Sequence, residues 1–158
     1  MTHARPIRLV LTGPESTGKS TLTESLGQRL GLPFAREYAR IYLERHGPDY
    51  NYDLLLQLSR EHRLYQRAMV SPDADVGVLD TDLINYKIWC EVVYGRCHPE
   101  IITAMEGEAD HVYLLCYPDL PWEPDPLREH PNDRLMLFER HQAEITRLGR
   151  RHAIIRGI

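Results

Sequence analysis

Eight consecutive residues near the N-terminus have the types and spacing of a phosphate-binding loop. The stretch from Gly13 to Ser20 reads GPESTGKS, between an apolar run at 8–12 and a segment of helical pattern at 19–30. In such a loop successive backbone N–H groups point into a concavity of phosphate size, and the following helix directs the positive end of its dipole there. The pattern therefore predicts a nucleotide-binding P-loop.

The side chains of this loop are expected to share the work of holding a nucleotide. Gly13 and Gly18 allow the close turn, Lys19 reaches the β and γ phosphates, Ser20 ligates Mg²⁺, and Thr21 hydrogen-bonds the α phosphate. ATP and Mg²⁺ are the expected cofactors. The predicted nucleotide-binding residues are Gly13, Glu15, Ser16, Thr17, Gly18, Lys19, Ser20 and Thr21.

Two carboxylates follow a later apolar run, and they are candidates for metal binding and catalysis. Asp80 comes directly after Val76–Leu79, where a second acidic residue holds the metal of such proteins through water. We predict Ser20 and Asp80 as the metal-binding residues. Asp82 is a candidate for catalysis and substrate binding, or equally the cap of a helix that begins at Leu83.

Missing motifs and the length of the chain argue against several classes of nucleotide-binding protein. The chain has no Asn-Lys-x-Asp sequence for reading guanine and no D-x-x-G after the third strand, which argues against a GTPase. Its length argues against a motor or an AAA machine. A small kinase remains as the predicted class.

A charged cluster follows the second predicted strand, with the order Arg36-Glu37-Tyr38-Ala39-Arg40. Open parallel sheets bind ligands at the carboxyl ends of their strands, and a carboxylate there can accept the proton of an attacking hydroxyl. Glu37 is therefore the first candidate for the base, and we group Tyr38 and Arg40 with it as substrate-binding residues. Arg36 and Arg40 are four residues apart and could meet an anionic group, although Glu37 and Arg40 could equally form a surface pair.

A proline-rich segment is expected to form a lid over the site. Residues 118–131 contain five prolines, a density that forbids regular structure. Arg128 and Arg134 lie at the end of this segment, so a lid over about 118–134 could carry both to the transferring phosphoryl group, where they would act catalytically with Lys19. The alternative is that both arginines are solvated surface residues.

These residues require a framework of alternating strands and helices. Such alternation predicts an α/β fold of the P-loop NTPase type: a five-stranded parallel sheet with helices on both faces and a lid, like the nucleoside and nucleotide kinases. We expect one domain over residues 1–158. The expected strands are 8–12, 33–36, 76–79, 112–117 and 153–156, and the expected helices are 19–30, 37–46, 51–69, 83–94, 99–106 and 132–148.

Composition limits the partners and the compartment. The net charge of −4 disfavours a long nucleic acid as partner, although a local basic patch would still permit one. Three cysteines without a C-x-x-C spacing argue against a disulfide framework or a structural zinc site and favour the cytoplasm. No apolar run is long enough to span a membrane. The oligomeric state stays open.

Some further residues favour the core rather than a site. His62 lies on the apolar face of the helix expected at 51–69 and is predicted to be a packed core residue. Trp89 and Trp122 are expected to anchor the core and the lid, or else to stack on a base.

Several of these stretches resemble a known family in order and spacing. GPESTGKSTL, FAREYARIYL, VLDTDLI, YLLCYPDLPWEPDPLREHPNDRLMLF and IIRG resemble the ribosylnicotinamide kinase domain of the NadR family and small stand-alone P-loop ATPases related to it. The resemblance spans nearly the whole chain. It implies a Mg-ATP-dependent kinase that phosphorylates the ribose 5′-hydroxyl of nicotinamide riboside. It also implies that Glu37 and Asp82 lie near the ribose and that Arg128 and Arg134 belong to the lid.

The resemblance has limits, and two other functions remain open. Nothing here resembles the adenylyltransferase and helix-turn-helix parts of NadR, so repression is not implied, and a further helix would be expected after the last strand. A 5′-hydroxyl polynucleotide kinase has an acid and an arginine spaced like Glu37 and Arg40. The other alternative is an ATP-dependent switch without a small substrate.

Overall fold

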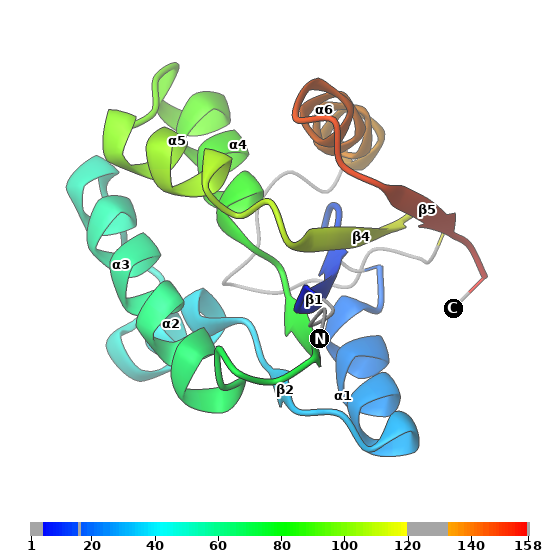
Figure 1. Cartoon of the computed structure of the whole chain (residues 1–158). Helices are drawn as coiled ribbons and strands as arrows, with labels where there is room; N and C mark the ends of the chain where they lie inside the picture. The colour runs from blue at the N-terminus through cyan, green and yellow to red at the C-terminus, as the bar shows by residue number, and fades with distance from the viewer. Residues whose placement is uncertain (1–4, 16, 120–132, 158) are drawn as a thin grey trace.

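The computed structural model describes residues 5–15, 17–119 and 133–157. Five strands alternate with six helices along these ranges (Figure 1). The elements in order are β1 (Ile7–Thr12), α1 (Lys19–Leu30), β2 (Phe34–Ala35), α2 (Tyr38–His46), α3 (Tyr52–Met69), β3 (Val76–Asp80), α4 (Leu83–Tyr94), α5 (Pro99–Glu106), β4 (His111–Cys116), α6 (Arg134–Arg147) and β5 (His152–Ile155).

The five strands form one parallel sheet in the order β2-β3-β1-β4-β5. In the register of the central strands, Leu11 of β1 pairs with Asp80 of β3, and Thr12 pairs with Leu115 of β4. Because all strands run in one direction, their carboxyl ends meet at one edge of the sheet. The segments that follow β1, β2 and β3 are therefore neighbours, and they carry most of the residues predicted for the site.

Helices cover both faces of the sheet, as expected for a parallel sheet buried on two sides. In Figure 1, α1 lies against one face, while α3, α4, α5 and α6 lie on the other. Each face has its own apolar core. Leu11, Val78 and Cys116 pack towards Leu22 and Leu26 of α1. A larger core that includes Val10, Leu79 and Tyr113 packs towards the remaining helices.

The predicted elements are confirmed, with ends that differ by no more than two residues. The helix expected from Glu37 begins at Tyr38, because the backbone of Glu37 is extended, with φ −68° and ψ 111°. Asn51 caps α3 by accepting a hydrogen bond from the amide of Leu54 at 2.7 Å. None of the helices in the described part of the chain has the length and apolar character needed to cross a membrane.

His62 packs in the larger core, as its place on the apolar face predicts. Its side chain is completely buried, with its ring against that of Tyr86 at a centroid distance of 5.2 Å. Neither ring nitrogen has a hydrogen-bond partner among the described residues. Burial without such a partner disfavours the charged ring and lowers the pKa of His62 to about 4.

We predict that His62 makes the protein less stable in mild acid. In the unfolded protein the imidazole of His62 has a pKa near 6.5, whereas in the folded protein it stays neutral until the pH approaches about 4. The unfolded state therefore binds more protons between these values, and the stability of the protein falls as the pH drops from about 6.5 towards about 4. Between about pH 7.5 and about pH 5 this loss amounts to about 2 kcal/mol. His62→Leu should shrink the difference in unfolding free energy between these pH values by that amount, measured by urea unfolding.

The exposed His46 provides the matched control. His46→Leu should keep the wild-type difference between the two pH values. A His62→Leu variant with the full wild-type difference would contradict the prediction.

Candidate functional site

A cavity opens at the carboxyl edge of the sheet, where the sequence places the phosphate loop. It encloses about 860 Å³, open solvent at its mouth included. The loop after β1 and the end of β3 form its floor. The start of α2, one face of α4 and the side of α6 form its walls. The cavity therefore joins the loop to three elements that are far apart in the sequence.

Two glycines give the phosphate loop its path. Gly13 has a φ of 128°, and a Cβ atom there would lie 2.8 Å from the carbonyl oxygen of Cys116 at the end of β4. Gly18 has a φ of 86° at the N-cap of α1. Since a side chain at either position would be strained, the chain can turn here from strand to helix only with glycine.

The loop holds its own lysine. Lys19 Nζ donates a hydrogen bond to the carbonyl oxygen of Pro14 at 2.8 Å, and Thr17 Oγ1 donates to the same oxygen at 3.0 Å. Lys19 is buried, while Ser20 and Thr21 are exposed on the first turn of α1. Lys19 and Glu15 line the cavity. Ser16, also expected to bind nucleotide, lies outside the described residues.

Ser20 and Asp80 meet as the predicted metal-binding pair. The Ser20 hydroxyl donates to Asp80 Oδ2 at 2.9 Å, because Asp80 ends β3 beside the end of β1. Hydroxyl and carboxylate oxygens are ligands that Mg²⁺ prefers, so this pair fits that ion.

Glu37 lies at the cavity as expected, and Arg40 lines it too. Within the described part of the chain, the Glu37 carboxylate has neither a hydrogen bond nor an ion pair. Arg40 pairs with Glu44 at 3.0 Å rather than with Glu37. Arg36, the other candidate for an anionic group, turns to α1 and pairs with Glu24 at 2.6 Å.

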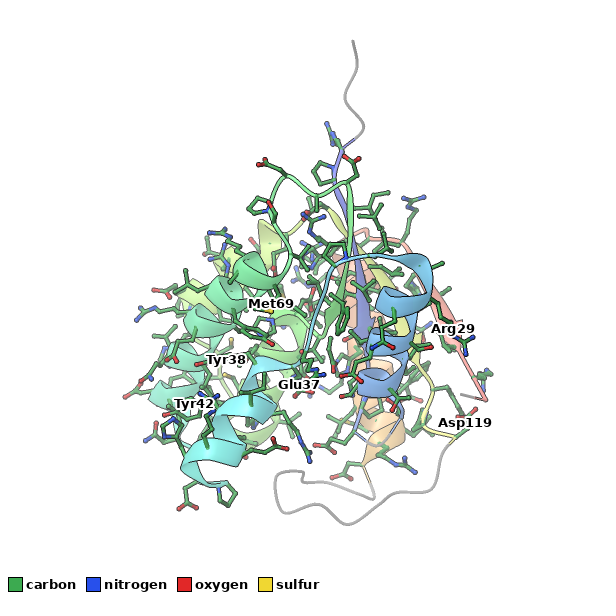
Figure 2. All side chains as sticks on the ribbon, turned by 90° about the horizontal axis from the view of Figure 1, so that it is seen from below. Arg29, Glu37, Tyr38, Tyr42, Met69 and Asp119 are labelled. Atoms are coloured by element: carbon green, nitrogen blue, oxygen red, sulfur yellow. The ribbon has the colours of Figure 1, made fainter. Side chains whose placement is uncertain are left out.

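Tyr38 is not among the residues that line the cavity, although the sequence grouped it with them. Its hydroxyl donates to Glu61 of α3 at 2.5 Å, and its ring packs against those of Tyr42 and Tyr65. Burial and the Glu61 carboxylate raise its pKa to about 12. In Figure 2 Tyr38 and Tyr42 lie along α2, and Glu37 lies nearer the middle of the molecule.

Asp82 is a helix cap, and the structure does not bring it to the cavity. One carboxylate oxygen accepts the amide of Ile84 at 3.0 Å. The other accepts the Tyr113 hydroxyl at 2.6 Å and lies 2.9 Å from Nδ1 of His111. Although burial alone would raise its pKa, the His111 and Tyr113 hydrogen bonds keep the pKa of Asp82 below its ordinary value. The helix-cap alternative is confirmed, since Asp82 accepts the amide of Ile84, while the expected contact of Asp82 with the substrate gains no support from this structure.

Of the two arginines predicted for the lid, the structure describes only Arg134. Arg128 and most of the predicted lid lie outside the described residues. Arg134 is the first residue of α6, one turn before Leu137, which lines the cavity. Its expected contact with phosphate stays a prediction.

The apolar wall of the cavity was largely missed by sequence reasoning. Tyr50 and Trp89 pack edge to face, with ring centroids 4.9 Å apart, and both line the cavity. Asn85 lines it one turn before Trp89 on α4. The spacing of Asn85 and Trp89, four residues apart on one helix, was the signal that could have found this wall.

His141 of α6 also lines the cavity, although no sequence pattern pointed to it as a site residue. It is almost fully buried, and its Nδ1 donates to the carbonyl oxygen of Leu137 at 2.7 Å. Burial lowers its pKa to about 4, so its ring is neutral at pH 7 and Nε2 keeps its lone pair. His141 therefore presents an acceptor to the site.

A family model described as an AAA domain (AAA_28) matches residues 8–157 of the chain. The length of the chain had argued against an AAA machine. The family name describes a domain, and the match says nothing of a machine assembled from such domains.

Two curated proteins are similar in sequence. They are the trifunctional NAD biosynthesis/regulator proteins NadR of Escherichia coli (strain K12) and Salmonella typhimurium (strain LT2), each 29% identical over 124 residues. The match covers 76% of this chain but spans 30% of each relative.

Solved structures share the fold at lower identity. A NadR protein in complex with NR aligns with a TM-score of 0.69 at 18% identity, over 97% of this chain and 46% of the other. A NadR protein with NAD and AMP-PNP gives 0.66 at 19%, over 97% and 45%. The YorR protein from Bacillus subtilis, in complex with phosphorylated GDP, gives 0.52 at 14%, over 94% and 84%.

The resemblance seen in the sequence is thus confirmed, and so is the P-loop kinase fold. The chain belongs to the AAA_28 family of AAA domains and shares the P-loop kinase fold of the solved NadR structures.

Proposed function

We propose that the chain is an ATP-dependent kinase that phosphorylates the ribose 5′-hydroxyl of a nucleoside, with nicotinamide riboside as the first candidate. One observation carries the proposal: the same cavity is lined by a phosphate loop, a carboxylate without a partner among the described residues, and a pair of aromatic rings. The sequence similarity to NadR and the NR complex of a protein with this fold favour nicotinamide riboside over other nucleosides.

The loop end of the cavity is suited to the triphosphate. Backbone N–H groups and the N-terminus of α1 would bind phosphate oxygens, and Lys19 would leave the Pro14 carbonyl to meet the β and γ phosphates. Ser20 and Asp80 would hold Mg²⁺, which offsets phosphate charge. Arg134, together with Arg128, would add charge to the transferring group.

The aromatic wall of the cavity is suited to a nucleoside. Tyr50 and Trp89 offer aromatic surface to a flat base, and Asn85 offers an amide beside them. Glu37, at the start of α2, lines the same cavity. It would accept the proton of the ribose hydroxyl as the γ-phosphoryl group is transferred.

A panel of acceptors with γ-labelled ATP tests the proposal. Nicotinamide riboside, the common nucleosides and a 5′-hydroxyl oligonucleotide are incubated separately with the protein and Mg²⁺. We expect label to move to nicotinamide riboside with the highest kcat/KM. Preferred labelling of the oligonucleotide would support a polynucleotide kinase instead. ADP formation without transfer to any acceptor would support a switch, and either result would overturn the proposal.

We predict that Glu37→Gln removes the base and leaves nucleotide binding intact. The variant keeps the size of the side chain but loses its basic oxygen, so kcat for acceptor phosphorylation should fall by roughly 10²- to 10⁴-fold while the affinity for ATP stays within a few fold. Steady-state kinetics with varied ATP and varied acceptor measure both quantities.

Asp82→Asn is the informative comparison. Asp82→Asn should lower the free energy of unfolding, measured with urea, by about 3 kcal/mol or more. The reason is that the buried groups of His111 and Tyr113 lose the carboxylate that they contact. The folded variant should keep kcat within a few fold. If Asp82→Asn shows the kinetic loss and Glu37→Gln does not, the assignment of the base is wrong.

A further inference from the structure

Thr81 has the least favourable backbone conformation of the described residues other than glycine. Its φ is +66°, and no other described non-glycine residue has a positive φ. Side chains rarely adopt this region, and residues that do so cluster at ligand-binding positions. Two hydrogen bonds keep the conformation: Thr81 N donates to the Leu11 carbonyl at 2.8 Å, and Gln66 Nε2 donates to the Thr81 carbonyl at 3.0 Å.

The side chain of Thr81 is unfavourable in a second, independent way. Thr81 is 1% exposed, and its Oγ1 has no hydrogen-bond partner among the described residues. A buried hydroxyl without a partner destabilises the free protein. Thr81 nevertheless lines the cavity. A ligand that bonds to Oγ1 would remove this defect.

The sheet order places Thr81 at the centre of the site. β3 lies between β2 and β1, so the residue after β3 lies between Glu37, which follows β2, and the phosphate loop, which follows β1. Thr81 also follows Asp80, the partner of Ser20. If Glu37 acts as the base and the loop holds the triphosphate, the attacking oxygen meets the γ phosphate between the same two elements.

We propose that Thr81 Oγ1 hydrogen-bonds the attacking hydroxyl of the phosphoryl acceptor and so selects an acceptor that presents a hydroxyl there. The Thr81 hydroxyl donates a hydrogen bond to a lone pair of the acceptor oxygen and keeps its own proton. The acceptor's proton passes to Glu37 as the oxygen bonds to the γ phosphorus and the bond from that phosphorus to ADP breaks. No covalent bond to Thr81 forms or breaks. The inference rests on the proposed kinase function and adds a substrate contact to it.

Thr81→Val and Thr81→Ser separate a binding role from a structural one. Valine keeps the shape and the backbone strain of threonine but lacks the hydroxyl, whereas serine keeps the hydroxyl. We expect Thr81→Val to lower kcat/KM for the acceptor by about 10- to 100-fold with KM for ATP nearly unchanged, while Thr81→Ser stays within about threefold. The unfolding temperature of ligand-free Thr81→Val should equal or exceed that of the wild type.

Thr12→Val is the matched control, because Thr12 Oγ1 is also buried without a partner among the described residues, and Thr12 does not line the cavity. It should leave kcat/KM for the acceptor unchanged. If Thr81→Val retains wild-type kcat/KM, or if it loses stability and ATP affinity together with activity, the inference is overturned while the kinase function stands. If the wild-type protein transfers phosphate to no acceptor, the proposed function fails, and this inference fails with it.

Discussion

The close approach of Gly13 to β4 is the constraint on which the site depends. The chain leaves β1 so near the Cys116 carbonyl that no side chain fits. This path turns the loop back over the end of the sheet and aims the N-terminus of α1 into the cavity. It also sets the first turn of α1 beside β3, where Ser20 reaches Asp80. One backbone contact thus positions the phosphate-binding and metal-binding groups together.

The parallel order of the strands adds the remaining groups to the same edge. Glu37 comes from the end of β2 and Thr81 from the end of β3, and each enters the cavity because its strand ends there. The buried contacts of Asp82 with His111 and Tyr113 have a different role, since they tie the start of α4 to β4. The site therefore has chemically active groups on its surface and a separate polar cluster that supports one wall.

The fold and the phosphate loop could be predicted from the sequence because the patterns that indicate them lie within short stretches of the chain. Hydrophobic periodicity and the glycine spacing predict the elements to within two residues, and strand ends predict Asp80 and Glu37 at the site. For Asp82 sequence reasoning left a role in the site and a helix cap equally open, because a local pattern does not show where a side chain points. The turn at Thr81 carries the Asp82 carboxylate to His111, a residue 29 positions away in the chain. Sequence reasoning offered Trp89 as a core anchor or a base-stacking residue but missed its pairing with Tyr50, since the two meet only through packing between distant segments.

The central claim, that the loop transfers a phosphoryl group to a small acceptor, is tested most directly at Lys19. The measurement is the single-turnover rate of label transfer from ATP to nicotinamide riboside by wild type and Lys19→Ala, with circular dichroism and thermal unfolding to establish that the variant is folded. Because Lys19 is asked to neutralise charge on the transferring group, the account predicts a loss on the order of a hundredfold or more in a folded variant. A folded Lys19→Ala protein that transfers phosphate at nearly the wild-type rate would contradict it.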